Sequence, residues 1–121
     1  MNITEDITKY TLVNKRMTGT TLKLFFRQHI DDKPQKVLEL KNIAAFIDNF
    51  NNQQLGTIEI RDLAGSYGMD MAMQLKRPEI KNYHEVFIFA NDTFSTSVFR
   101  ALAENVTWRD YDDHRFGDNN Y

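Results

Sequence analysis

The chain has 121 residues, of which 41% are hydrophobic and 26% are charged, and its formal net charge is -2. These values predict one globular domain spanning residues 1–121, and they lie far from those of disordered or membrane-spanning chains. No cysteine is present, which excludes disulfides, thiolate zinc sites and a cysteine nucleophile. A charge so close to neutrality does not indicate electrostatic binding to nucleic acid or to an anionic membrane.

The N-terminal sequence and the short apolar clusters predict a cytoplasmic protein without a membrane span. Residues 1–6 contain two acidic side chains where a secretory signal needs positive charge, and no apolar run follows them. The apolar cluster at residues 86–90 is far shorter than the roughly 20 residues that cross a bilayer. We therefore expect neither export nor membrane insertion.

A hairpin is the first element that the pattern predicts. Apolar residues at alternate positions from Leu22 to Phe26 have the period of a half-buried strand, which predicts a strand over 20–30. Turn-forming residues follow at 31–34, and residues 37–40 predict a return strand antiparallel to the first.

Phe25 lies on the opposite face of this strand from Leu24 and Phe26, between Lys23 and Arg27. Two interpretations of its ring are equally supported. It belongs to an exposed contact surface on a basic strand, or it is covered by the N-terminal part of the chain.

The next segment predicts a helix over 43–53. Asn42 is suited to the N-cap position, and the apolar residues Ile43, Phe46, Ile47 and Phe50 recur at the spacing of one helical face. This spacing also predicts that the phenylalanine rings are part of the core.

A second hairpin and a further strand are predicted in the middle of the chain. Residues 57–63 alternate between apolar and polar, and a glycine-containing connection at 64–68 follows. Residues 69–76 contain good helix formers, but their strict alternation favours a strand. Residues 85–90 predict a central strand that is buried on both faces.

A last helix is predicted from about residue 93 to residue 105. Polar residues at 91–93 are suited to cap it, and Phe94, Val98 and Leu102 would form its inward stripe. The predicted element order is ββαβββα. The expected fold class is therefore α+β, with a mostly antiparallel sheet of about five strands and two helices packed on it.

No recognisable catalytic constellation is present. The sequence lacks the glycine-rich phosphate loop, the dinucleotide-binding glycine motif, the nucleophile elbow and the zinc-protease helix. The three histidines, His29, His84 and His114, are dispersed along the chain. We expect a non-catalytic protein without a cofactor.

The acidic cluster at 110–114 is the one place where several oxygen ligands and an imidazole gather. It lacks the ligand spacing and the central glycine of a calcium-binding loop. The cluster therefore predicts a solvated acidic segment and no metal site.

Residues 107–121 form an acidic, aromatic segment, here called the acidic tail. Residues 104–121 contain five acidic side chains against two arginines. Large aromatic anchors among acids are typical of a surface that binds a basic groove. The predicted protein-binding residues are Trp108, Asp110, Tyr111, Asp112, Asp113, Phe116 and Asp118.

These features predict a non-catalytic protein-binding module. Its size and charge are typical of an inhibitor from a phage or mobile element, or of an immunity protein against a toxin. Its partner would be a nucleic-acid-handling enzyme with a basic groove, and the tail would imitate nucleic acid. An alternative for the tail is that it packs on the sheet as part of the fold. The sequence does not predict an oligomeric state.

The alternative function is nucleic-acid binding through the basic first third of the chain. Residues 1–41 contain eight lysines and arginines against five acids. The residues concerned are Lys9, Lys15, Arg16, Lys23, Arg27, Lys33, Lys36 and Lys41.

Overall fold

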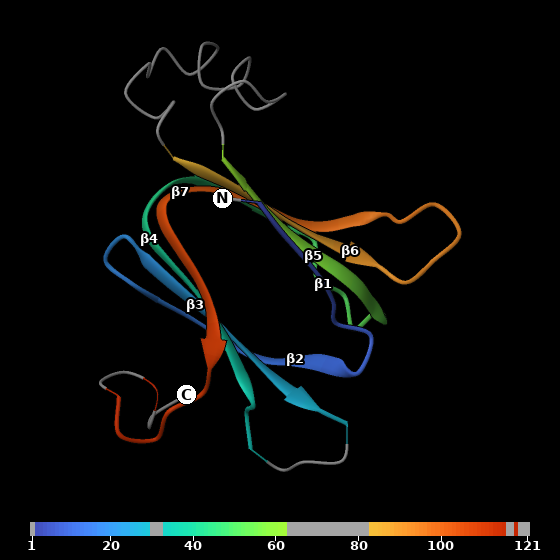
Figure 1. The fold of residues 1–121 in the computed structure, drawn as a ribbon, viewed down its shortest axis with the longest axis horizontal. Helices are drawn as coiled ribbons and strands as arrows, with labels where there is room; N and C mark the ends of the chain where they lie inside the picture. The colour runs from blue at the N-terminus through green and yellow to red at the C-terminus, as the bar shows by residue number, and fades with distance from the viewer. Residues whose placement is uncertain (1, 30–32, 63–82, 116–117, 119–121) are drawn as a thin grey trace.

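The computed structural model describes residues 2–29, 33–62, 83–115 and 118, which form one seven-stranded antiparallel sheet without a helix (Figure 1). In chain order the strands are β1 (Ile3–Asp6), β2 (Tyr10–Thr18), β3 (Thr21–Gln28), β4 (Lys36–Asp48), β5 (Leu55–Asp62), β6 (His84–Ala90) and β7 (Ser97–Asp110). Across the sheet their order is β1-β5-β6-β7-β4-β3-β2.

The two long central strands give the sheet its shape. β4 and β7 pair along most of their length and curve together through the middle of the molecule (Figure 1). At the bend the register shifts between Ile43 and Ala45, and Asn42 has a φ of 54°. The Asn42 amide donates to the Glu104 carboxylate at 2.6 Å. Such bulges bend a strand, so that one end of β4 pairs with β3 while its other end pairs with β7, whose opposite edge carries β6.

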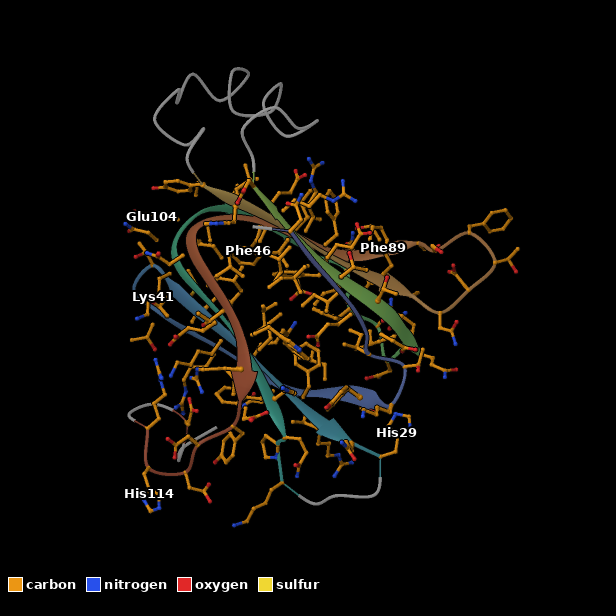
Figure 2. All side chains as sticks on the ribbon, viewed as in Figure 1. His29, Lys41, Phe46, Phe89, Glu104 and His114 are labelled. Carbon is orange, nitrogen blue, oxygen red and sulfur yellow. The ribbon has the colours of Figure 1, made fainter. Side chains whose placement is uncertain are left out.

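The core lies inside the curve of the sheet, where side chains from both halves meet (Figure 2). Leu24 and Phe26 of β3, Leu38 of β4, and Ile58 and Ile88 from the opposite half are all fully buried. Removing each such side chain from water stabilises the fold by about 1.5–3 kcal/mol before entropy is counted. The core therefore holds the two halves of the curved sheet together.

The two edge strands are drawn together although they lie at opposite ends of the strand order. β1 and β2 are joined by only three residues, 7–9. The Trp108 indole on β7 donates to the Glu5 carboxylate on β1, and the Tyr10 ring on β2 packs edge-on against the same indole at 6.0 Å. The curvature thus brings both β1 and β2 into contact with one tryptophan.

The predicted helix over 43–53 is wrong, because residues up to Asp48 belong to β4. Ile43 and Phe46 both face the core side, three positions apart, because the bulge inserts one extra residue between them. This insertion produces a helical spacing within a strand. Phe46 stacks on Phe99 but remains 44% exposed, so it is not the core residue that the helical pattern predicts.

The predicted helix over 93–105 is also wrong, because its residues from Ser97 onward form β7. The Asp92 carboxylate accepts hydrogen bonds from the Phe94 and Thr96 backbone N–H groups, at 3.1 and 3.0 Å. It therefore stabilises a turn, and Phe94 is 88% exposed on it. Residues 98–103 lie between β4 and β6 and are largely buried on both faces, which removes the alternation that identifies a strand.

The expected α+β fold is therefore replaced by an all-β sheet in the described part of the chain. The predicted strand over 20–30 is confirmed as β3, and residues 37–40 return antiparallel to it within β4. The strands predicted at 57–63 and 85–90 are confirmed as β5 and β6. The strand predicted at 69–76 lies outside the described residues.

Candidate anion-binding site

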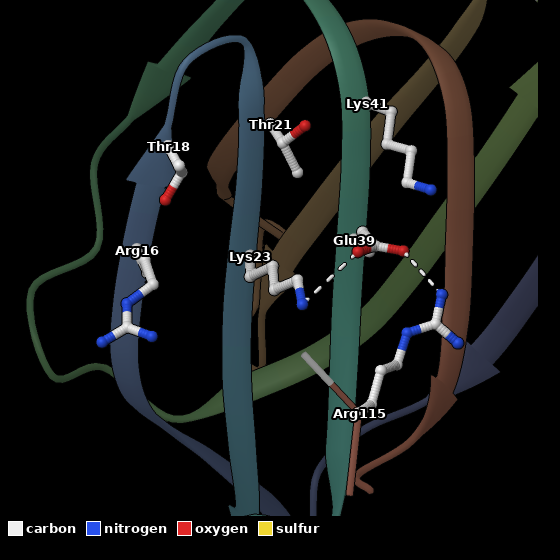
Figure 3. Close-up of a pocket in the computed structure, with 7 residues that line it drawn as sticks. All are labelled: Arg16, Thr18, Thr21, Lys23, Glu39, Lys41 and Arg115. Atoms are coloured by element: carbon white, nitrogen blue, oxygen red, sulfur yellow. Dashed lines mark ion pairs between the residues drawn. The ribbon is translucent and has the colours of Figure 1, made fainter. Parts of the chain in front are cut away.

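A cavity of about 380 Å³ lies on the outer face of β2, β3 and β4, away from the core (Figure 3). Its volume is within the range of sites for small ligands, about 300–1,000 Å³. Side chains from three strands and from the C-terminal end of the chain line it: Arg16, Thr18, Thr21, Lys23, Glu39, Lys41 and Arg115.

The period of the strands explains why these polar residues share one face. Arg16, Lys23 and Glu39 are direct neighbours across β2, β3 and β4, while the leucines on either side of Lys23 and Glu39 in sequence face the core. Thr18 lies opposite Thr21 at the end of the same hairpin. The turn between them contains Gly19, whose φ of 62° suits the tight hairpins in which glycine is preferred.

The lining of the cavity is strongly cationic. Four basic side chains and one carboxylate give it a formal charge of +3. The carboxylate, Glu39, is only 5% exposed and is shared by Lys23 Nζ and an Arg115 guanidinium nitrogen, each at 3.5 Å. Positive charges gathered in a cavity attract an anion, because the weakly polar walls concentrate the electric field of these charges.

Residues 111–115 and Asp118, here called the outer segment, pack on this face of the sheet. The Asp118 carboxylate is fully buried and accepts hydrogen bonds from Lys23 Nζ at 3.0 Å and from both Arg109 Nη atoms at 2.7 and 3.0 Å. It also accepts from the Asp112 backbone N–H at 3.2 Å. Hydrogen bonds between ionised groups are about twice as strong as neutral ones, so these contacts hold the outer segment firmly.

These contacts determine the ionisation of Asp118. Burial alone would raise its pKa, but the hydrogen bonds from Arg109 and Lys23 outweigh burial and lower the pKa to about 2. The hydrogen bond to Asp118 also raises the pKa of Arg109. Both groups are therefore charged at neutral pH.

The outer segment also explains the position of Phe25. This ring is fully buried, and it meets the Tyr111 ring edge-on at a centroid distance of 6.4 Å. Phe25 is therefore not an exposed contact residue, and the residue that covers it comes from the C-terminal side of the chain.

The predicted protein-binding residues of the acidic tail have different surroundings. Trp108 packs edge-on against Phe26 at 5.4 Å and belongs to the border of the core. Asp110 is paired with Lys36 at 2.8 Å, yet its side chain is 87% exposed. Tyr111 is half-buried.

The remaining residues of that prediction are divided between the surface and the interior. Asp112 and Asp113 are exposed, and Asp113 lies 3.7 Å from Lys33. Asp118 is buried, and Phe116 lies outside the described residues. Contact of the exposed acids with a protein partner stays a prediction.

The basic residues of the alternative prediction also separate into groups. Arg16, Lys23 and Lys41 line the cavity together. Three other lysines are paired with acids elsewhere: Lys15 with Asp48, Lys33 with Asp113, and Lys36 with Asp110. Lys9 lies over the Tyr10 ring at 5.6 Å, and the buried Nε of Arg27 has no hydrogen-bond partner among the described residues.

Sequence reasoning did not find Arg115, Thr18 or Thr21 as site residues. The two threonines flank a glycine-containing hairpin turn, which is a signal that the sequence does carry. Arg115 is distant in sequence from β2, β3 and β4, which carry the other lining residues, and the packing of the outer segment places it at the cavity.

In the described part of the chain, the histidines and acids do not gather into a group that could hold a metal ion. Figure 2 shows His29 and His114 on opposite sides of the molecule, and His84 Nδ1 lies 3.1 Å from the Glu104 backbone carbonyl oxygen. Within the described ranges, no group of three or more histidine, aspartate or glutamate side chains is arranged to hold a metal ion. The same part of the chain contains no helix with the length and apolarity needed to span a membrane.

The cavity is thus a place where the fold gathers four cationic side chains around one lining carboxylate. Its floor is held by a buried lysine and a buried glutamate, and its cationic rim is contributed by separate elements of the chain. Comparisons of this chain with protein-family models, with curated proteins and with solved structures find no match.

Proposed function

We propose that this chain is a non-catalytic binding protein that holds a compact anion of the phosphate class in the outer-face cavity. The observation that supports this proposal is the +3 lining around a space of about 380 Å³. One guanidinium group can donate hydrogen bonds to two oxygens of the same phosphate, and the ammonium group of a lysine adds a compact positive charge. The two threonine hydroxyls supply additional donors at the rim.

A compact ligand fits the charge distribution better than a long polyanion does. Outside the cavity, Lys15 is paired with Asp48 and Lys36 with Asp110, so these lysines do not continue the cationic surface as a track along a nucleic acid. A nucleic acid gains affinity when many lysine and arginine side chains along one surface neutralise its phosphates at once. One concentrated cationic hollow is suited to a ligand with one or two phosphate groups.

Pyrophosphate and inorganic phosphate are suitable probes of this proposal. Calorimetric titration should show pyrophosphate binding, with a rise in melting temperature as the anion concentration increases. Lys41→Gln should weaken binding on the order of tenfold, because it removes one charged hydrogen-bond donor from the rim. Lys9→Gln is the matched control, since Lys9 does not line the cavity and should leave the affinity unchanged.

Two outcomes would contradict the proposal. One is the absence of pyrophosphate binding at millimolar concentration, and the other is equal binding by the parent and Lys41→Gln. Oligonucleotides test the nucleic-acid alternative in the same assay. The logarithm of the binding constant falls with the logarithm of the salt concentration, and the slope increases with the number of phosphates contacted. Strong oligonucleotide binding with a slope that indicates several phosphate contacts would favour an extended nucleic-acid surface over a compact ligand.

A protein partner with a basic surface is a second proposal, favoured by the exposure of Asp110 and Asp113. Affinity capture with the parent chain tests it, followed by capture with Asp110, Asp112 and Asp113 all changed to Asn. A partner retained by the parent and lost by the variant would support the acidic contact. Equal retention would remove the exposed acids from the interface.

A further inference from the structure

We propose that Asp118 is a positioning residue for the anion cavity, and that anion binding and docking of the outer segment are energetically coupled. This inference rests on the proposed function, because it concerns how that cavity is completed. It assigns to Asp118 no contact with the ligand. Asp118 contacts the lining residue Lys23, and we assign its effect on the anion to the position that it gives Arg115.

Arg115 depends on the outer segment for its place at the cavity. Among the described lining residues, the other six come from β2, β3 and β4. The Arg115 backbone N–H donates to the Asp112 carbonyl at 3.1 Å, and the Asp118 N–H donates to the Arg115 carbonyl at 2.9 Å. These bonds fix the distance between the Arg115 backbone and the Asp118 carboxylate.

Asp118 attaches this unit to the sheet. Its two cationic partners, Lys23 on β3 and Arg109 on β7, belong to the strands on either side of β4. The carboxylate therefore bridges across β4, the strand that carries Glu39 and Lys41. Figure 3 shows Arg115 reaching toward Glu39 from the side opposite Lys23. Asp118 thus determines where the Arg115 guanidinium lies relative to the other cavity cations.

Coupling follows from the thermodynamics of this arrangement. An anion that contacts Arg115 in the cavity binds the docked form of the outer segment more tightly than the undocked form. By linkage, the anion then stabilises docking by the same factor by which docking improves anion affinity. Loss of the Asp118 contacts should therefore weaken anion binding even though Asp118 lies outside the cavity lining.

The test compares pyrophosphate affinity in four variants: Asp118→Asn, Arg115→Gln, the double variant and Asp113→Asn. Asp118→Asn and Arg115→Gln should each weaken binding on the order of tenfold, as expected for loss of a charged donor. The double variant should bind pyrophosphate with the same affinity as the single variant that binds it less tightly, because both changes remove the same interaction. Asp113→Asn makes the same chemical change in the same segment, at an exposed carboxylate, and should bind like the parent.

A second measurement keeps the inference testable if Asp118→Asn does not fold. Hydrogen exchange of the Asp112 and Asp118 backbone N–H groups in the parent reports docking, since both are donors within the outer segment. Pyrophosphate should slow their exchange severalfold. Unchanged exchange at saturating pyrophosphate would overturn the coupling.

The failure of this inference differs from failure of the proposed function. If Lys41→Gln weakens pyrophosphate binding while a folded Asp118→Asn binds like the parent, the cavity binds anions but Asp118 does not position it. If Lys41→Gln and Arg115→Gln both bind like the parent, the cavity itself is not the binding site. Additive losses in the double variant would also overturn the positioning role, since they indicate independent contributions.

Discussion

Asp118 keeps its charge in a fully buried position because two cationic side chains and a backbone N–H surround it. A buried ion pair contributes little net stability, since desolvation offsets the attraction, but the loss of one partner leaves the other charges uncompensated. We therefore expect Asp118→Asn to lower the free energy of unfolding by about 3–5 kcal/mol at neutral pH. Urea unfolding of the two proteins measures this difference.

The lowered pKa of the Asp118 carboxylate makes the stability of the fold depend on pH in the acidic range. Its pKa is lowered from 3.8 to about 2, so its contribution is fully present above pH 4 and is lost as the pH falls toward 2. Hydrogen bonds also lower the pKa of Asp6, Asp92 and Asp110, so the parent loses stability from several groups over this range. The difference in unfolding free energy between the parent and Asp118→Asn isolates one group, and it should shrink from pH 5 to pH 2. A constant difference would contradict this account.

Phe46 and Phe99 are neighbouring rings with different burial. Phe46 is 44% exposed, whereas Phe99 is 1% exposed in the core, and their centroids are 6.4 Å apart. Phe99→Ala should cost about 3–5 kcal/mol of stability, the usual range for a buried ring. Phe46→Ala should cost about 1–2 kcal/mol, because water already reaches nearly half of its surface. Thermal or urea unfolding of both variants checks the ranking, and equal losses would show that Phe46 is a core residue after all.

At the scale of the elements, the bend in β4 depends on Asn42. Its φ of 54° lies in the left-handed region that asparagine and glycine tolerate and β-branched residues avoid. Asn42→Val should lower stability by about 1–3 kcal/mol through backbone strain. Asn42→Gly keeps the backbone conformation and loses the side-chain hydrogen bonds to Glu104 and to the Thr20 hydroxyl, so it should cost about 1 kcal/mol. Denaturant midpoints of the two variants give the comparison, and a larger loss for glycine than for valine would contradict a strain-based bend.

The strand pairings of β4 and β7 also determine what the bend does for the candidate site. Lys36 pairs with Asp110 near one end of the ladder, and Asp48 pairs with Phe99 near the other. Because the ladder curves between these points, the chain that follows β7 lies on the outer face of β3 and β4. The outer segment and Arg115 therefore lie at the cavity.

For the whole molecule, the sheet connects residues that are far apart in sequence. Ile3 pairs with Ile60, and Lys36 pairs with Asp110, so long loops must close before these contacts form. Proteins dominated by such pairings fold in milliseconds to seconds. The single tryptophan, Trp108, touches the core and both edge strands, so its fluorescence in a stopped-flow experiment should report this slow phase. Complete refolding within a few tens of microseconds would contradict the expectation.

The sequence by itself determined the strands in which apolar residues recur at alternate positions. β3 has apolar residues at alternate positions, and β5 has the same pattern, so period two identified both without tertiary information. It also established the absence of familiar catalytic motifs and the separation of basic and acidic residues along the chain. These are local properties that no packing arrangement changes.

Only the tertiary structure decided the fold class and the composition of the candidate site. The bulge gave β4 a helical spacing, and burial on both faces removed the strand pattern from β7, so both segments resemble helices in sequence although each is a strand. The edge strands β1 and β2 carry weak patterns because they are partly exposed on both faces. The cavity combines residues from β2, β3, β4 and the outer segment, and the charge at each position acquires its partners only when strand pairing brings these segments together.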